Sequence, residues 1–304
     1  MPIQKQKSTI QDLLTVDFPD PFVLREGAEY YAYATNAGGC NVQMLHSSDL
    51  RAWEHLGDAL PQLPAWAAAG QSLTWAPSVL KRDGIYVLYY TARFAAAGLQ
   101  CLGCASSESP TGPFRDASTR PFLCQEHLGG SIDPSPFVED DGSAYLLWKN
   151  DGNSCELPTG LWLQALRADG LAVEGEAVEL LRRDQTWELP LVEAPALVKH
   201  GGRYYLFYSG NWWESADYAI SYAVSHTLAG PYIKPHDDPW FTRRGDTLGP
   251  GGQEFFTDTN GRLWMAYHAW AAPNTGYPAG VRSLRLAQVS FESGLPVVKA
   301  PIGI

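Results

Sequence analysis

Residues 20–35, DPFVLREGAEYYAYAT, form the segment whose repetition decides the fold. The pattern returns as WAPSVLKRDGIYVLYYTA at 75–92, DPSPFVEDDGSAYLLWKN at 133–150, EAPALVKHGGRYYLFYSGN at 193–211 and GQEFFTDTNGRLWMAYHAW at 252–270. Each copy has a short apolar run, a polar turn that contains glycine, and an aromatic-rich run. This order is typical of a strand, a hairpin turn and a second strand.

The spacing of the copies predicts the architecture. The aromatic residue after each turn (Tyr30, Tyr86, Tyr145, Tyr204 and Trp264) recurs at intervals of 56, 59, 59 and 60 residues. Each interval also contains a weaker second hairpin, which makes about four strands per repeat, as in one propeller blade. We therefore expect an all-β, five-bladed β-propeller with four antiparallel strands per blade, forming a single domain over residues 1–304. A β-sandwich, or a pair of small β domains, would not produce five evenly spaced copies.

Composition and charge exclude several classes of function. The net charge of −11 argues against nucleic acid, whose phosphates require a basic surface. No apolar run reaches the roughly 18 residues that a membrane-spanning helix needs, so no membrane partner is expected. The first residues, MPIQKQKSTIQ, lack the apolar segment of an export signal, which predicts a cytoplasmic protein.

The cysteine count also indicates a protein that is not exported. The five cysteines are Cys40, Cys101, Cys104, Cys124 and Cys155. An odd number favours free thiols in a reducing compartment when no export signal is present. Cys101 and Cys104 form a C-x-x-C pair, the spacing of zinc and redox sites. No second such pair and no nearby pair of histidines accompanies it, so zinc is the less favoured interpretation.

Three acidic residues occupy corresponding places in the repeats. Asp20-Pro21, Asp133-Pro134 and Glu193-Ala194-Pro195 align with one another and with Trp75-Ala76-Pro77. The innermost strands of a propeller line its central channel, so aligned residues meet at one mouth of that channel. Acids there could instead cap strand ends or hold a central cation. The neighbouring prolines and apolar strands favour a functional role, because they are a poor setting for solvated surface charge.

Converging carboxyl groups suit the cleavage of a glycosidic bond. One carboxylic acid protonates the leaving oxygen while a carboxylate activates water or attacks the anomeric carbon. A third carboxylate close to the acid would raise its pKa by like-charge repulsion. The sequence contains no Ser/His/Asp order, nucleotide-binding glycine loop or H-E-x-x-H motif that would indicate another chemistry.

These motifs together resemble glycoside hydrolase family 43 along nearly the whole chain. FPDPF at 18–22 is similar to the segment that carries the family's general base, which implies that role for Asp20. SIDPSPFVEDDG at 131–142 is similar to the segment of the pKa-modulating aspartate, here Asp133, and VEAPALVKHGGRYYLFYS at 192–209 to that of the general acid, here Glu193. WAPSV at 75–79 matches the second-blade motif. The resemblance implies an inverting, single-displacement mechanism with no cofactor in the chemistry.

The resemblance also suggests residues around the three acids. GRLWMAYH at 261–268 ends in His268, which in some relatives lies on the channel axis and helps hold a calcium ion or a water cluster. GPGGQ at 249–253 departs from the family pattern, because Gly252 stands where many members have histidine. Arg282 matches an arginine of the last blade that often lies near the acid, and we expect it to bind the substrate, with Arg285 as the alternative.

Sugar contacts are expected from aromatic residues near the mouth. The candidates are Trp75, Phe137 and either Trp212 or Trp213, each with core packing as the alternative role. Asp17, Asp140 and Asp141 are interpreted as structural, since the latter two fall in a hairpin turn and Asp17 should point away from the channel if Asp20 points into it.

The shared motifs leave the sugar open among α-L-arabinofuranosides, β-D-xylosides and arabinan. A protein that is not exported is expected to act on short pentose-containing oligosaccharides, which favours the removal of single terminal sugars. The lack of a C-terminal β-sandwich argues against the two-domain xylosidase type. We therefore favour α-L-arabinofuranosidase activity, followed by β-D-xylosidase and then endo-1,5-α-L-arabinanase. A catalytically inactive, sugar-binding propeller is the alternative outside enzymes.

Overall fold

The structure is a computed structural model that describes residues 7–9, 11–70 and 73–301. Residues 1–6 and 10, which belong to the N-terminal stretch that lacks an apolar segment, lie outside the described residues. Within the described ranges the only helical segments are short 3-10 turns: η1 (Asp12–Thr15), η2 (Glu126–Leu128), η3 (Gly152–Cys155) and η4 (Thr186–Glu188). No helix in this part of the chain is long and apolar enough to cross a membrane.

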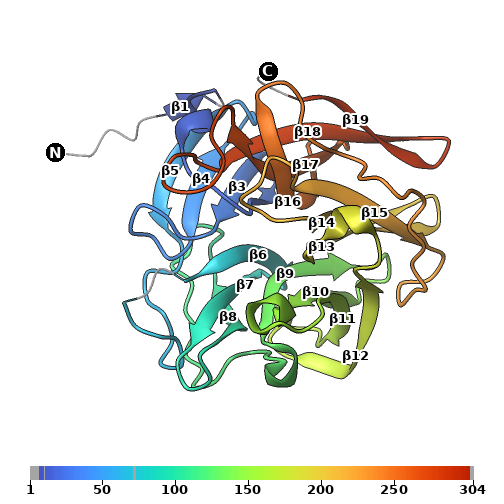
Figure 1. Cartoon of the computed structure of the whole chain (residues 1–304). Coiled ribbons are helices and arrows are strands. Elements are labelled where there is room, and N and C mark those ends of the chain that lie inside the picture. Colours follow the sequence, from blue (N-terminus) through green and yellow to red (C-terminus); the bar gives the residue numbers. More distant parts are fainter. Residues whose placement is uncertain (1–6, 10, 71–72, 302–304) are drawn as a thin grey trace.

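The described strands form five antiparallel sheets arranged around a centre in chain order, as predicted (Figure 1). Blade one contains β2 (Phe22–Glu26), β3 (Glu29–Ala34), β4 (Gln43–Ser47) and β5 (Ala52–Asp58), with β1 (Lys7–Thr9) on its outer edge. Blade two contains β6 (Trp75–Arg82), β7 (Ile85–Phe94) and β8 (Leu99–Ser107). Blade three contains β9 (Ser131–Val138), β10 (Ala144–Asn150), β11 (Gly160–Leu166) and β12 (Val173–Arg182). Blade four contains β13 (Val192–His200), β14 (Arg203–Gly210) and β15 (Ala219–Ser225), and blade five contains β16 (Thr247–Thr257), β17 (Leu263–Ala271), β18 (Ser283–Glu292) and β19 (Leu295–Pro301).

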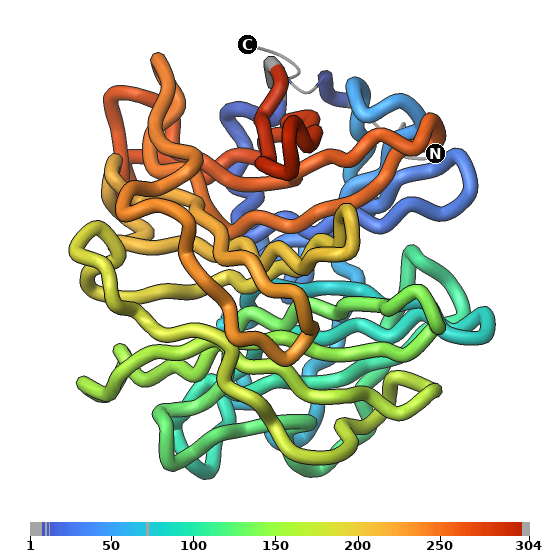
Figure 2. The backbone as a smooth tube through the Cα atoms, turned by 90° about the vertical axis from the view of Figure 1, so that its right-hand side faces the viewer, coloured from blue at the N-terminus to red at the C-terminus, as the bar shows by residue number. Residues whose placement is uncertain are grey.

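The first strand of each repeat is the innermost strand of its blade. β2, β6, β9, β13 and β16 contact one another in that order, and β16 returns to β2, so the inner strands form a closed ring. Figure 2 shows the closure from the side, with the red end of the chain beside the blue first blade. Corresponding residues of the five inner strands therefore do meet around one channel.

Four strands per blade holds for blades one, three and five. In the described part of blades two and four the fourth strand is reduced to isolated bridges, Ser106 to Arg115 in one and Val224 to Ile233 in the other. These outer segments contain Gly112-Pro113 and Gly230-Pro231. Proline cannot donate a ladder hydrogen bond, which shortens pairing at a sheet edge.

In the described part of the chain, the buried apolar side chains form five clusters, each between two neighbouring blades. One cluster, for example, joins Phe22 and Met44 of blade one to Val79 and Leu88 of blade two. Corresponding clusters lie between each other pair of neighbouring blades. Both faces of every sheet are thus covered, which explains why the strands are aromatic-rich runs with little polar alternation.

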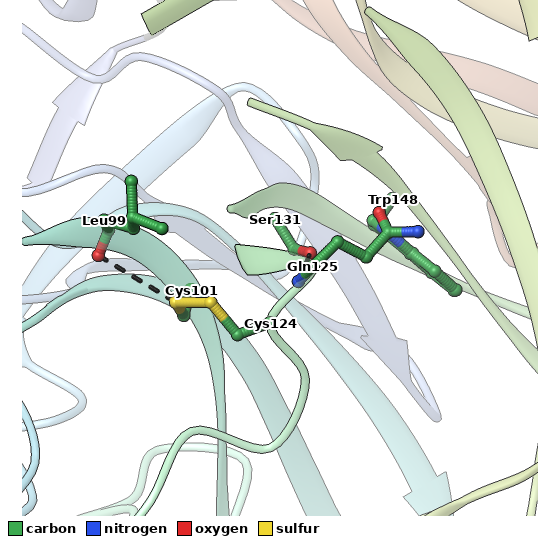
Figure 3. Close-up of a disulfide and its surroundings, with 6 residues drawn as sticks. All are labelled: Leu99, Cys101, Cys124, Gln125, Ser131 and Trp148. Carbon is green, nitrogen blue, oxygen red and sulfur yellow. Dashed lines mark hydrogen bonds between the residues drawn. A yellow bond between two sulfur atoms is a disulfide. The ribbon is translucent and has the colours of Figure 1, made fainter. Parts of the chain in front are cut away.

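A disulfide joins Cys101 on β8 to Cys124 in the loop that follows (Figure 3). The expectation of five free thiols is therefore wrong for these two; Cys40, Cys104 and Cys155 are free. The pair is not evident in the sequence because the cysteines are 23 residues apart, and it is the bridge between Leu123 and Leu102 that brings Cys124 to β8. No group of three metal-binding side chains occurs among the described residues, so the C-x-x-C spacing does not reflect an assembled zinc site.

Candidate active site

A backbone irregularity shapes the channel end of every inner strand. A residue at this end of each strand has a left-handed φ: Asp20 (52°) just before β2, Ala76 (42°), Asp133 (58°), Ala194 (50°) and Gly252 (59°). A bulge of this kind costs about 1–3 kcal/mol for a residue other than glycine, and it turns the strand locally. Neighbouring residues, which point to opposite faces in a regular strand, can then both reach the same cleft.

The bulge corrects the alignment of the three acids by one residue. Asp20 and Asp133 occupy the left-handed position itself, whereas blade four places Ala194 there and Glu193 one residue earlier. Glu193 therefore corresponds to Trp75 of blade two, and both line the cleft beside the aspartates. The acids converge as predicted, but they approach from two different positions of the strand.

The three carboxyl groups meet in a cleft of about 790 Å³ at one mouth of the channel. Of the residues expected to contact sugar, Trp75, Trp212 and Arg282 also line it. The other lining residues are Asp17, Thr35, Asn36, Ile132, Lys149, Asp151, Asn153, Ser154, Pro190, Ala194, Trp213, Tyr218 and Tyr277.

Asp20 is surrounded by groups that favour its ionised form. Thr35 Oγ1 donates a hydrogen bond to Oδ2 at 2.6 Å, and Arg282 Nη1 lies 3.7 Å from Oδ1. Burial alone would raise the pKa of Asp20, but the Arg282 charge, the adjacent His268 ring and the hydrogen bond from Thr35 together outweigh it and hold that pKa well below its ordinary value. Asp20 is therefore a carboxylate that can accept a proton.

His268 is held by Asp20 from the other side. The backbone N–H of Asp20 donates to Nδ1 at 3.0 Å, and burial lowers the pKa of the imidazole, so the neutral ring carries its proton on Nε2. Nε2 is buried without a partner among the described residues. Ca²⁺ takes six to eight oxygen ligands, and no group of three His, Cys, Asp or Glu side chains assembles in this part of the chain. The calcium ion implied by the resemblance stays a prediction.

Gly252 explains one departure from the expected motif. A Cβ atom built on it would lie 2.6 Å from His268 Nδ1 and 2.8 Å from Asp20 Oδ1. A side chain at this position would therefore displace the pair that it adjoins. The close approach therefore requires glycine here, and the left-handed φ favours it.

Glu193 is hydrogen-bonded through both carboxyl oxygens. Tyr218 donates to Oε1 at 2.7 Å, and Lys149 Nζ lies 3.0 Å from Oε2. Lys149 is only 1% exposed, and its ammonium also lies 3.6 Å from Asp151 Oδ1. Neither of these contacts of Glu193 was expected from the sequence. The aligned repeats do contain an indication of the Lys149 contact, because Lys149 stands at a position where other blades have a small or neutral polar residue.

Asp133, the neighbour of Glu193, has a raised pKa. Burial and the adjacent Glu193 charge raise the pKa of Asp133 to about 8, against the opposing effects of Lys149 and of the Ala194 N–H, which donates to Oδ2 at 2.9 Å. Two interacting carboxyls share their protons as a pair. Near neutral pH this raised pKa therefore keeps a proton within the pair, on Asp133, whereas the sequence suggested that Glu193 would hold it.

Aromatic rings and Arg282 build the wall beside Asp20. The Arg282 guanidinium lies 4.5 Å over the ring of Trp213, and Trp212 is 42% exposed beside it. Tyr277 Oη donates to Asp17, which also accepts the Arg282 N–H. Asp17 thus lines the cleft and positions this wall, contrary to the expectation that it points away.

Two further expectations are corrected. Phe137 is 9% exposed and packs between blades three and four, edge-on to Tyr204, outside the cleft lining. The strand has left the channel mouth by that point, so Phe137 is not a sugar contact. Arg282 lies beside Asp20, the expected base, where we expected it near the acid, while Arg285 donates to Ser283 and lies outside the lining. Asp140 sits in its hairpin turn, paired with Lys199, as expected.

Comparisons with known proteins agree with this geometry. The family model described as glycosyl hydrolases family 43 matches residues 12–296. The chain is 27% identical to a xylosidase/arabinosidase of Butyrivibrio fibrisolvens over 94% of its own length, but it spans only 55% of that relative. It is 25% identical to the extracellular endo-α-(1→5)-L-arabinanase 1 of Bacillus subtilis, covering 91% of this chain and 86% of that one. The crystal structure of a thermostable family-43 glycoside hydrolase superposes with a TM-score of 0.83 at 29% identity, covering 99% and 95% of the two chains.

Proposed function

Because the chain belongs to glycosyl hydrolases family 43, we propose that it releases terminal pentose, α-L-arabinofuranose first, from arabinan- or arabinoxylan-derived oligosaccharides. One observation carries the proposal. The cleft holds an ionised carboxylate at Asp20 and, within the same walls, a carboxyl pair that retains a proton at neutral pH. Groups whose environments separate their pKa values in this way are suited to be the base and the acid of one reaction.

The chemistry follows from these two states. Asp20 removes a proton from a water molecule, which attacks the anomeric carbon. The pair formed by Asp133 and Glu193 supplies the proton for the leaving oxygen, with Glu193 as donor. Bond cleavage by direct attack of water inverts the anomeric configuration. Trp212 and Trp213 offer apolar ring surface on which the C–H face of a sugar can stack.

The choice of sugar rests on the relatives. The Butyrivibrio relative is named for both xylosidase and arabinosidase activity, and the Bacillus relative for arabinanase activity. β-D-Xylosidase activity, alone or together with arabinofuranosidase activity, is therefore the second candidate, and endo-arabinanase the third.

A direct assay tests the proposal. Nitrophenyl α-L-arabinofuranoside, nitrophenyl β-D-xyloside and linear arabinan are incubated with the protein side by side. We expect the fastest release from the arabinofuranoside, with a product of inverted configuration by proton NMR. Hydrolysis of none of the three would overturn the function in favour of a sugar-binding propeller, and a product of retained configuration would overturn the mechanism.

Two variants separate the roles of the acids. Asp20→Ala and Glu193→Ala should each lower the rate by about 10²–10⁴-fold. A substrate with a good leaving group needs little protonation, so it should partly restore Glu193→Ala and leave Asp20→Ala inactive. Equal restoration of both variants would show that the roles are misassigned.

A further inference from the structure

A buried lysine stands against the residue that must act as the acid. Lys149 lies at the channel end of β10, opposite Ile132 of β9. In blades two, four and five the residue at the corresponding pairing is Thr91, Ser209 or His268. Blade three alone among these places a full positive charge there, and the mechanism above does not use it.

The contacts of Glu193 are those of a carboxylate. The Lys149 ammonium has donors only, and the Tyr218 hydroxyl donates its proton to Oε1. A proton on Oε2 would compete with the Lys149 hydrogen that points at the same oxygen from 3.0 Å. The resting arrangement therefore stabilises the ionised form of the group that must later give a proton away.

Lys149 has a second carboxylate within reach. Asp151 Oδ1 lies 3.6 Å from Nζ, and both side chains are buried in the cleft wall. A small movement of the flexible lysine side chain would exchange one carboxylate for the other. The charged and titratable groups that act on Glu193 from the surrounding elements are Asp133, Lys149, Asp151, Tyr218 and His268.

We propose that Lys149 is a positioning residue that holds Glu193 in place as a carboxylate in the free enzyme and turns to Asp151 when Glu193 takes up its proton. The inference rests on the proposed function, in which Glu193 is the acid. The proton comes from solvent or from the shared pair, and Lys149 keeps its own three protons throughout. Lys149 and Asp151 thereby set the pH above which the acid fails.

Two variants should move the alkaline limb of the pH–rate profile in opposite directions. Lys149→Met removes the opposing cation, so the limb of kcat/KM should rise by about 1–2 pH units. Asp151→Asn removes the alternative partner and leaves Lys149 on Glu193, so the limb should fall by about half a unit to one unit. Lys149→Arg keeps the charge and should restore the limb. Lys199→Met removes a lysine that forms an ion pair with Glu139. This variant is the matched control and should leave the alkaline limb unmoved.

A second readout does not depend on activity. Carbon-13 NMR of the glutamate side-chain carboxyls, with the signal of Glu193 identified by its loss in Glu193→Gln, reports the titration directly. We expect it to shift with the limb in both variants. A wild-type protein that hydrolyses no pentoside would refute the proposed function while the titration still tests Lys149.

The inference is overturned if Lys149→Met loses rate equally at every pH with the limb and the carboxyl titration unmoved. Should that variant fail to fold, Asp151→Asn decides alone. A limb and a titration that stay in place, or move upward, refute the exchange between the two carboxylates.

Discussion

Replacing Arg282 by methionine should shift the acid limb of the pH–rate profile to higher pH. Arg282 is a buried cation 3.7 Å from Asp20 Oδ1. At an effective dielectric constant of about 20, charges about 4 Å apart attract by about 4 kcal/mol. One pKa unit corresponds to about 1.4 kcal/mol, so the loss raises the pKa of Asp20 by at most about 3 units.

Solvent at the partly exposed carboxylate reduces this figure, and we expect a rise of about 1–3 units. The rate requires ionised Asp20, so its loss on acidification should begin at correspondingly higher pH. The assay is kcat/KM from about pH 3 to 8 with a pentoside that has a good leaving group. Methionine keeps much of the volume that packs over Trp213, and thermal unfolding checks that the variant is folded.

Arg285→Met is the matched control. Arg285 is a buried arginine of the same segment. Its side chain donates a hydrogen bond to Ser283 and does not line the cleft. Its acid limb should match that of the wild type. If Arg282→Met lost rate at all pH values with an unmoved limb, or if both variants shifted it equally, the electrostatic role assigned to Arg282 would be refuted.

Three other perturbations test separate parts of the structure. Asp133→Asn should move the alkaline limb to lower pH, because an amide cannot share the proton that the pair retains with a pKa of about 8; a uniform rate loss would mean that Asp133 only hydrogen-bonds the sugar. Gly252→Ala should lower kcat at least about tenfold, because its Cβ atom would lie 2.6 Å from His268 Nδ1. Gly201 has a similar φ but open space around it, so Gly201→Ala should cost only about 1 kcal/mol of stability and leave activity unchanged. Equal kinetics for the two variants would contradict the steric argument. Burial raises the pKa of Glu254 to about 8, so the folded state keeps a proton that the unfolded chain releases near pH 4.5. The free energy of unfolding therefore falls by up to about 1.4 kcal/mol for each pH unit between these two values. Glu254→Gln should flatten that fall in urea unfolding at pH 5 and pH 8, and an unchanged slope would show that Glu254 is not the group responsible.

The three acidic residues of the site could be predicted from the sequence because the repeats show which residues occupy corresponding places in the fold. Copies of one strand pattern at nearly equal spacing must occupy equal places around a closed ring. The sequence pattern therefore predicted that Asp20, Asp133 and Glu193 meet at one mouth of the channel, although Glu193 stands one residue before the position of the two aspartates. The turn residues and apolar runs that define each blade act over a few neighbours, which is the range that a sequence displays directly.

The tertiary structure decided how those acids are partnered. Lys149 of blade three meets Glu193 of blade four, and Arg282 of blade five meets Asp20 of blade one. The pairing of Cys101 with Cys124 was likewise hidden. Such contacts join segments that are distant along the chain, and they depend on how sheets stack and where each strand bulges. The sequence alone therefore determined the number of blades and the place of the carboxyl groups, whereas packing between blades determined which of them holds the proton.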